Sequence, residues 1–349
     1  MISRSVAVLL AALAWTDLAA AQEDRILLAD GKKIEGVKVT AFDVRELRYA
    51  KGGNNESVAT DQVQTVELGK FKDVYRRDDP DSMVTVARDQ LQAKNAVMAQ
   101  IGMLRAAEGF LDAGKAQEGI GTLDEIAKSF PEGGVLPDVF RRKFEYYMAS
   151  GAKGAPSAKK VADKFLADSR GGAWPGGLQV EAEFFVAMAE RATGGTPKDL
   201  QAKLRGIVGK AMGSNPSVGN RANVQLANSL RETKEVDAAK RLYDEVLRKD
   251  NVDTNARAGA MLGLGQITME QGTQADKEPY RQALLLFLGV RLKTRDAWPS
   301  LQAEAMYNAI LAADKWRGPD YQYMMARCRG VLYNEFPDSE WTARAKAGR

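Results

Sequence analysis

The pattern of apolar and polar positions changes once along the chain, near residue 69. Between residues 22 and 68, short runs of alternating apolar and polar residues are separated by turn signals such as Asp30-Gly31 and Gly52-Gly53. Strands this short are not stable singly and must close on one another. The pattern therefore predicts a small five-stranded β barrel in residues 22–68.

From residue 83 to residue 349, apolar residues recur at helical spacing, and turn signals such as Ser214-Asn215-Pro216 break the pattern at short intervals. Residues 69–82 form a charged linker. It ends at Asp79-Pro80, where we expect a helix start with Asp81 or Ser82 as the N-cap. The chain is thus predicted to be mainly α, with short helices paired as hairpins and stacked as a solenoid.

Two stretches of this helical region carry the same order of small and large apolar residues. The small residues would let a facing helix approach, and the large ones would fill the remaining gap. The packing positions are Ala106, Ala107 and Phe110 in residues 100–131, and Leu226, Ala227, Leu230, Ala239, Tyr243 and Val246 in residues 221–251.

This order of residues resembles the tetratricopeptide (TPR) repeat. The resemblance implies an α-solenoid of helical hairpins over residues 83–349, with a concave groove that binds peptides. The chain departs from the family pattern at Met103 and Asn223, which stand where the repeat has a tryptophan. In the same way, residues 26–49 together with the closing stretch 61–68 resemble small envelope β modules of SH3-like or Sm-like form.

The first 21 residues have the order of a secretory signal peptide. Arg4 supplies a basic start, residues 6–15 form an apolar core, and Ala19-Ala20-Ala21 offers a cleavage site before Gln22. The apolar core is too short to span a bilayer. We therefore expect an exported chain, periplasmic or secreted and soluble after cleavage, with no transmembrane segment. An uncleaved N-terminal anchor is the alternative.

The amino-acid composition excludes several classes of catalytic and metal-binding site. The chain has 349 residues, a net charge of +4, one cysteine and no histidine. Histidine-based triads, histidine-ligated metals and zinc–thiolate clusters are therefore excluded. Gly109 to Lys115 spells G-x-x-x-x-G-K, but Ala116 follows where a phosphate-binding loop needs Ser or Thr. Gly114 is better explained as the glycine that ends a helix. We predict no enzyme activity, no catalytic residue, no cofactor and no metal.

Two groups of residues are candidates for partner binding. The positive charge is densest at Arg141, Arg142 and Lys143, and the aromatic residues Tyr146 and Tyr147 follow directly. Near the C-terminus, Tyr321 and Tyr323 flank a pair of methionines. Tyr, Met and Arg are favoured in interface cores. The alternative is that no partner is involved: the basic residues would lie on solvent-exposed helix faces, and the aromatic residues would pack between repeats.

These observations favour a non-enzymatic adaptor, or scaffold, that binds protein partners in the cell envelope. The alternative is a glycan- or cell-wall-binding protein in which the N-terminal barrel binds the polysaccharide. A histidine-free hydrolase with paired carboxylates is a third hypothesis. Nucleic acid is not expected as a partner, because export and the balanced charge of the strand region argue against it.

Overall fold

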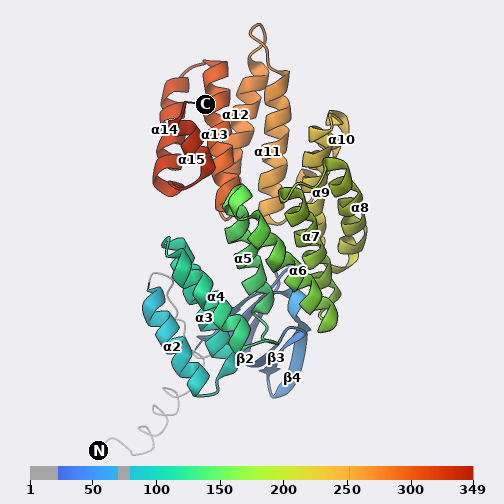
Figure 1. Cartoon of the computed structure of the whole chain (residues 1–349), viewed down its shortest axis with the longest axis vertical. Coiled ribbons are helices and arrows are strands. Elements are labelled where there is room, and N and C mark those ends of the chain that lie inside the picture. Colours follow the sequence, from blue (N-terminus) through green and yellow to red (C-terminus); the bar gives the residue numbers. More distant parts are fainter. Residues whose placement is uncertain (1–22, 70–78, 251, 349) are drawn as a thin grey trace, which may run out of the picture. The chain divides into compact units, whose positions relative to one another are not determined.

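The computed structural model describes residues 23–69, 79–250 and 252–348 (Figure 1). These residues fall into two compact units. The N-terminal unit runs to Tyr147 and also contains Lys160–Ala182. The C-terminal unit contains Met148–Lys159 and the chain from Glu183 onward. The predicted signal peptide lies outside the described residues, as does most of the predicted linker.

The N-terminal unit opens with a five-stranded antiparallel sheet in the order β4-β3-β2-β1-β5. The strands are β1 (Asp24–Leu28), β2 (Lys33–Phe42), β3 (Glu46–Lys51), β4 (Asn54–Ala59) and β5 (Val63–Glu67). Both predicted tight turns contain glycines with positive φ, as at Gly31 and Gly53. The five strands are confirmed. β4 and β5 are the edge strands of the sheet, so its closure into a barrel stays a prediction.

Helices follow the sheet. They are α2 (Pro80–Gln92), α3 (Ala96–Asp112), α4 (Ala116–Ser129), α5 (Leu136–Ala149), α6 (Ala155–Gly171) and α7 (Gly176–Ala192). The predicted start of α2 is two or three residues late, because the Asp79 side chain accepts the hydrogen bond of the Ser82 N–H and Pro80 takes the first helical position. Gly114 has a φ of +74° and ends α3, as predicted.

The sheet and the helices α3 and α5 are joined by hydrogen bonds. The buried Gln100 side chain donates to the Phe42 carbonyl at 3.0 Å and accepts from the Val135 N–H at 3.3 Å. The Gly134 N–H also donates to the Phe42 carbonyl, at 3.1 Å. A Cβ at Gly134 would lie 2.2 Å from the Phe42 ring, so only glycine allows this approach. The change of pattern at residue 69 is therefore a change of secondary structure within one compact unit.

The C-terminal unit consists of helices that each pack against the next, while α11 also packs against α9 on one side and α13 on the other. It includes the part of α7 from Glu183 onward. Its further helices are α8 (Pro197–Ser214), α9 (Pro216–Glu232), α10 (Val236–Arg248), α11 (Thr254–Gln271), α12 (Glu278–Lys293), α13 (Pro299–Trp316), α14 (Tyr321–Glu335) and α15 (Glu340–Lys346). This alternation is the arrangement of a TPR-like solenoid (Figure 1). The predicted fold class, a mainly α chain of helical hairpins behind five strands, is confirmed.

The predicted packing residues lie inside these helix pairs. Ala106, Ala107 and Phe110 are buried in α3. In α9 and α10 the buried positions include Leu226, Ala227, Leu230, Ala239, Tyr243 and Val246. Tyr243 shows how closely the helices approach, because a Cβ at Gly263 of α11 would lie 2.2 Å from its ring. Within the described ranges, the helices are all too short or too polar to cross a membrane.

Candidate binding sites

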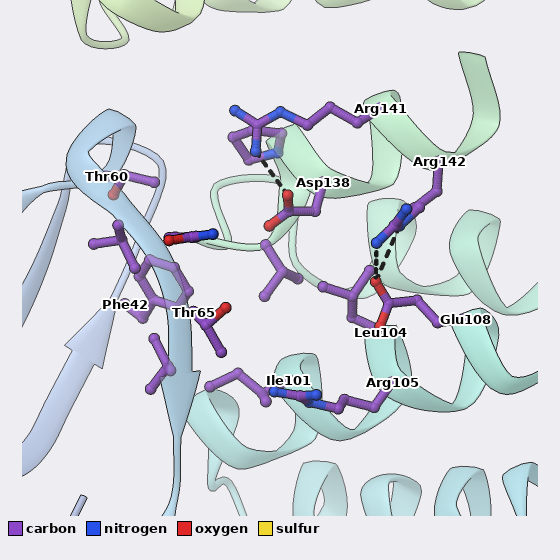
Figure 2. A pocket seen from close by; sticks show the side chains of 16 residues that line it. Phe42, Thr60, Thr65, Ile101, Leu104, Arg105, Glu108, Asp138, Arg141 and Arg142 are labelled. Carbon is purple, nitrogen blue, oxygen red and sulfur yellow. Dashed lines mark hydrogen bonds and ion pairs between the residues drawn. The ribbon is translucent and has the colours of Figure 1, made fainter. Parts of the chain in front are cut away.

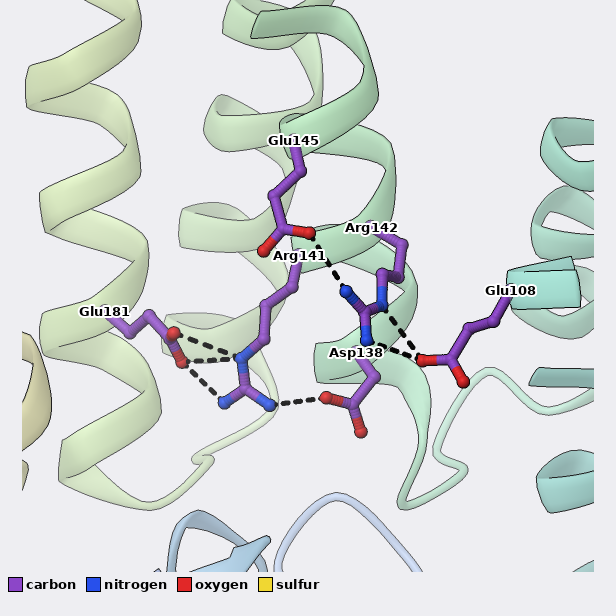
Figure 3. Close-up of polar contacts among 6 residues, drawn as sticks. All are labelled: Glu108, Asp138, Arg141, Arg142, Glu145 and Glu181. Atoms are coloured by element: carbon purple, nitrogen blue, oxygen red, sulfur yellow. Dashed lines mark hydrogen bonds and ion pairs between the residues drawn. The ribbon is translucent and has the colours of Figure 1, made fainter. Parts of the chain in front are cut away.

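The predicted basic run lies on α5, and its first member is held in an ion-pair network (Figure 3). Arg141 donates through Nε and Nη2 to Glu181 at 2.6–3.1 Å and through Nη1 to Asp138 at 2.7 Å. The Glu181 side chain is only 1% exposed, and that of Arg141 is 28% exposed. Burial alone would lower the pKa of Arg141, but Glu181 and Asp138 outweigh it and raise that pKa.

The next two basic residues are paired as well. Arg142 donates to Glu108 at 2.7 Å and to Glu145 at 3.2 Å, and Lys143 donates to Asp124 at 2.5 Å. The positive charge that stands out in the sequence is therefore balanced by carboxylates of the same unit. Two of these, Glu108 and Glu181, come from α3 and α7, far away in the sequence, and no local pattern could have identified them.

The aromatic candidates fall in both units. Tyr146 and Tyr147 are half-buried on α5 and meet edge to face, with 5.3 Å between ring centroids. In the C-terminal unit, Tyr321 is half-buried on α14. Tyr323, by contrast, is 61% exposed, and its hydroxyl accepts a hydrogen bond from Arg327 at 3.0 Å. Of the four tyrosines, Tyr323 offers a partner the most accessible ring.

A groove of about 290 Å³ lies in the C-terminal unit, and most of the residues that line it belong to α9, α11 and α13. Aromatic side chains from α7 and from the residue before α13 line it, together with carboxamides and charged groups. The lining includes the side chains of Phe184, Gln225, Asn228, Arg231, Asn255, Gln266, Trp298 and Glu304. The sequence reasoning missed this groove. One local pattern in the sequence indicates the groove. The polar residues Arg221, Gln225, Asn228 and Glu232 recur at helical spacing and therefore share one face of α9, beside its buried apolar residues.

Hydrogen bonds orient the polar groups of the groove. Tyr243, buried beneath it, donates to Asn228 at 2.5 Å, and Asn228 donates to Gln225 at 3.2 Å. Further along, the backbone N–H of Trp298 donates to the side-chain carbonyl oxygen of Asn255 at 2.7 Å. These bonds leave the amide nitrogens of Gln225 and Asn255 without partners among the described residues. Both nitrogens can therefore donate to the carbonyl groups of a bound chain.

The charged groups of the groove are only partly compensated. Gln266 donates to Glu304 at 2.9 Å, yet burial dominates and raises the pKa of the Glu304 carboxyl. Arg231 lies 3.6 Å from Glu270, and its Nε is buried without a hydrogen-bond partner in the part of the chain that the structure describes. Buried polar atoms of this kind are rare and call for an explanation such as a ligand.

A second, smaller pocket of about 150 Å³ lies within the N-terminal unit (Figure 2). It is bounded by β5, by one face of α3 and by the first turns of α5. Thr65 lines it from the strand, Ile101, Leu104 and Arg105 line it from α3, and Arg142 lines it from α5. The sequence pattern did not indicate this pocket, because its walls come from segments far apart in the chain.

In the described ranges there is no group of three or more His, Cys, Asp or Glu side chains that could hold a metal ion. The one cysteine, Cys328, is buried, and burial raises the pKa of its thiol to about 11. Its thiolate is therefore scarce at neutral pH, which makes it a poor nucleophile.

Comparison with known proteins finds structural neighbours of low similarity. Protein-family models do not match the chain, and neither do curated proteins. Among solved structures, the chain is similar to a Podosopora anserina protein described as a kinesin light chain with nearly identical TPR-like repeats. Identity is 13% and the TM-score is 0.37, over 57% of this chain and 98% of that one. A variant of that protein has the same identity and TM-score over 56% and 96%. This likeness carries no argument about function.

Proposed function

We propose that the chain is a non-enzymatic adaptor that holds an extended segment of a partner protein in the groove of its C-terminal unit. The observation that carries the proposal is the row of partly unengaged amide groups along α9 and α11. Gln225 and Asn255 can donate to a peptide backbone, whatever its sequence. The adjoining Phe184 and Trp298 supply apolar surface for side chains.

Rigid support for the groove comes from the helices beneath it. Tyr243 fixes Asn228 from below, and the close approach at Gly263 fixes the distance between α10 and α11. A groove that is already formed loses little conformational entropy when a peptide binds. The proposed place of action, the cell envelope, rests on the signal-peptide pattern of residues 1–21. Of the sequence-predicted candidate tyrosines, Tyr323 has the most exposed ring and is a separate candidate contact on α14.

Affinity capture with a matched pair of variants tests the proposal. A chain of residues 22–349, which keeps every described element, is immobilised and exposed to native envelope extract, and retained proteins are identified by mass spectrometry. Gln225→Lys places a long cationic side chain in the groove, whereas Gln282→Lys makes the same change on an exposed position of α12. We expect a small set of proteins retained by the original chain and by Gln282→Lys, and lost with Gln225→Lys.

Two outcomes would contradict the proposal. The first is an empty protein list, in which case binding of cell-wall polysaccharide to the same immobilised chain is measured next. The second is the same set of proteins on both variants, because binding would then not involve the groove. Circular dichroism of the original chain and of both variants checks that each chain is folded, so that unfolding does not account for either result.

A further inference from the structure

One wall of the pocket in the N-terminal unit is formed by β5, an edge strand of the sheet. Among the described residues, β5 pairs with β1 and with no other strand, so its second edge is unpaired there. Alternate residues of an edge strand direct their N–H and C=O groups away from the sheet, where they can pair with an added strand. Val63 to Val66 of this strand line the pocket, and Gln64 is exposed.

The opposite wall carries one unbalanced charge. Five charged side chains line the pocket, and four of them form the pairs Asp138–Arg141 and Glu108–Arg142. The fifth is Arg105. It is half-buried and points from α3 across the pocket toward the strand that carries Thr65 (Figure 2). It has no ion pair or hydrogen bond with any described residue. A carboxylate would complement it with charge-assisted hydrogen bonds.

The remaining lining suits the side chains of an extended peptide. Ile101, Leu104 and Pro137 provide apolar surface beside Arg105, and Thr65 adds a hydroxyl from the strand. The space of about 150 Å³ is enough for one or two side chains and too small for a helix about 10 Å across. An extended segment that lies along β5 would place alternate side chains toward the pocket.

We propose that this pocket is a second binding site, which takes an extended acidic segment of a partner protein as an added strand on β5. The backbone of the segment pairs with the free edge, and a glutamate or aspartate side chain reaches Arg105. The site is separate from the groove of the C-terminal unit, and it depends on none of the groove residues. A protein with both sites can hold two segments, from one partner or from two.

The experiment uses peptides of defined chemistry. A fluorescent ten-residue peptide of alternating threonine and glutamate, blocked at both ends, is titrated with the chain of residues 22–349 and followed by anisotropy. We expect Arg105→Gln to weaken binding by about tenfold or more, the usual effect of losing a charge-assisted hydrogen bond. Lys128→Gln removes a positive charge from an exposed position on α4 and serves as the matched control. It is expected to leave the affinity unchanged.

Two further peptides separate charge from strand pairing. Replacing glutamate by glutamine should weaken binding to the level seen with Arg105→Gln. Methylating alternate backbone nitrogens keeps the charge but prevents strand addition, and should abolish binding. The proposal is overturned if the methylated peptide binds equally well, if Arg105→Gln has no effect, or if no binding occurs at millimolar peptide. It is also overturned if a soluble cell-wall oligosaccharide, and not the acidic peptide, binds in an Arg105-dependent way.

Discussion

Glu181 is the most deeply buried carboxylate in the ion-pair network of α5. Its side chain is 1% exposed and holds Arg141 through two nitrogens. Removing one partner of a buried pair costs about 3–5 kcal/mol when the other charge is left uncompensated. Arg141 keeps its bond to Asp138, so the lower value, about 3 kcal/mol, applies here. We therefore expect Glu181→Gln to lower the free energy of unfolding by about that amount, as measured by denaturant titration.

A surface pair supplies the control for this prediction. Glu125 bonds Arg88 in the same bidentate manner, but that arginine is half exposed to solvent. Exposed pairs contribute less than about 1 kcal/mol, so Glu125→Gln should have a small effect. Equal losses for the two variants would show that the network on α5 is no more stabilising than an ordinary surface contact.

The same network explains why the ion-pair partners of the basic residues on α5 could not all be predicted from the sequence. The sequence shows Arg141 and Arg142 side by side, and their partners three residues away, Asp138 and Glu145, are visible in it. Successive residues of a helix point about 100° apart, so the two arginines face different neighbours. Which neighbours those are depends on tertiary packing, which a run of positive charge cannot reveal.

Helix ends and helix interiors place opposite demands on glycine, and α3 and α4 show both. Gly114 has a φ of +74°, whereas Gly121 lies inside α4, where an added Cβ would meet nothing within 4 Å. We expect Gly114→Ala to destabilise the chain by about 1–2 kcal/mol, the cost of a left-handed conformation for a residue with a Cβ. Gly121→Ala should stabilise it by about 0.5–1 kcal/mol through helix propensity. Thermal unfolding of the two variants measures both, and shifts of the same sign would contradict the argument.

Elements with local signals were predicted well from the sequence. The glycine that ends α3 was recognised from its place after an apolar helix. The five strands followed from alternation and turns in the same way. The α2 cap was misplaced because three acidic or hydroxyl residues, Asp79, Asp81 and Ser82, compete around one proline.

For the whole molecule, the fold class could be predicted because helical hairpins repeat a local pattern. The two cavities could not, since each is lined by segments that only the packing of the chain brings together. The junction of the sheet with α3 and α5 escaped prediction for a similar reason. It depends on Gln100, an amide within a helix that looks like any other polar position, and on the close approach at Gly134.

The pH dependence of global stability tests whether the groove keeps a costly charge. Burial raises the pKa of Glu304 in the folded chain above its unfolded value, so the folded state binds this proton more tightly. The ionised carboxylate therefore costs stability at neutral pH, and the cost disappears as pH falls through the raised pKa to the ordinary glutamate value. Glu304→Gln, which still accepts a hydrogen bond from Gln266, should be more stable than the original chain at pH 7 and lose that advantage near pH 4.

Urea unfolding of both chains across this pH range measures the difference in their free energies of unfolding directly. A constant difference would mean that Glu304 titrates normally. If the stabilised variant also loses the captured partners, the charge is retained for binding at the expense of stability.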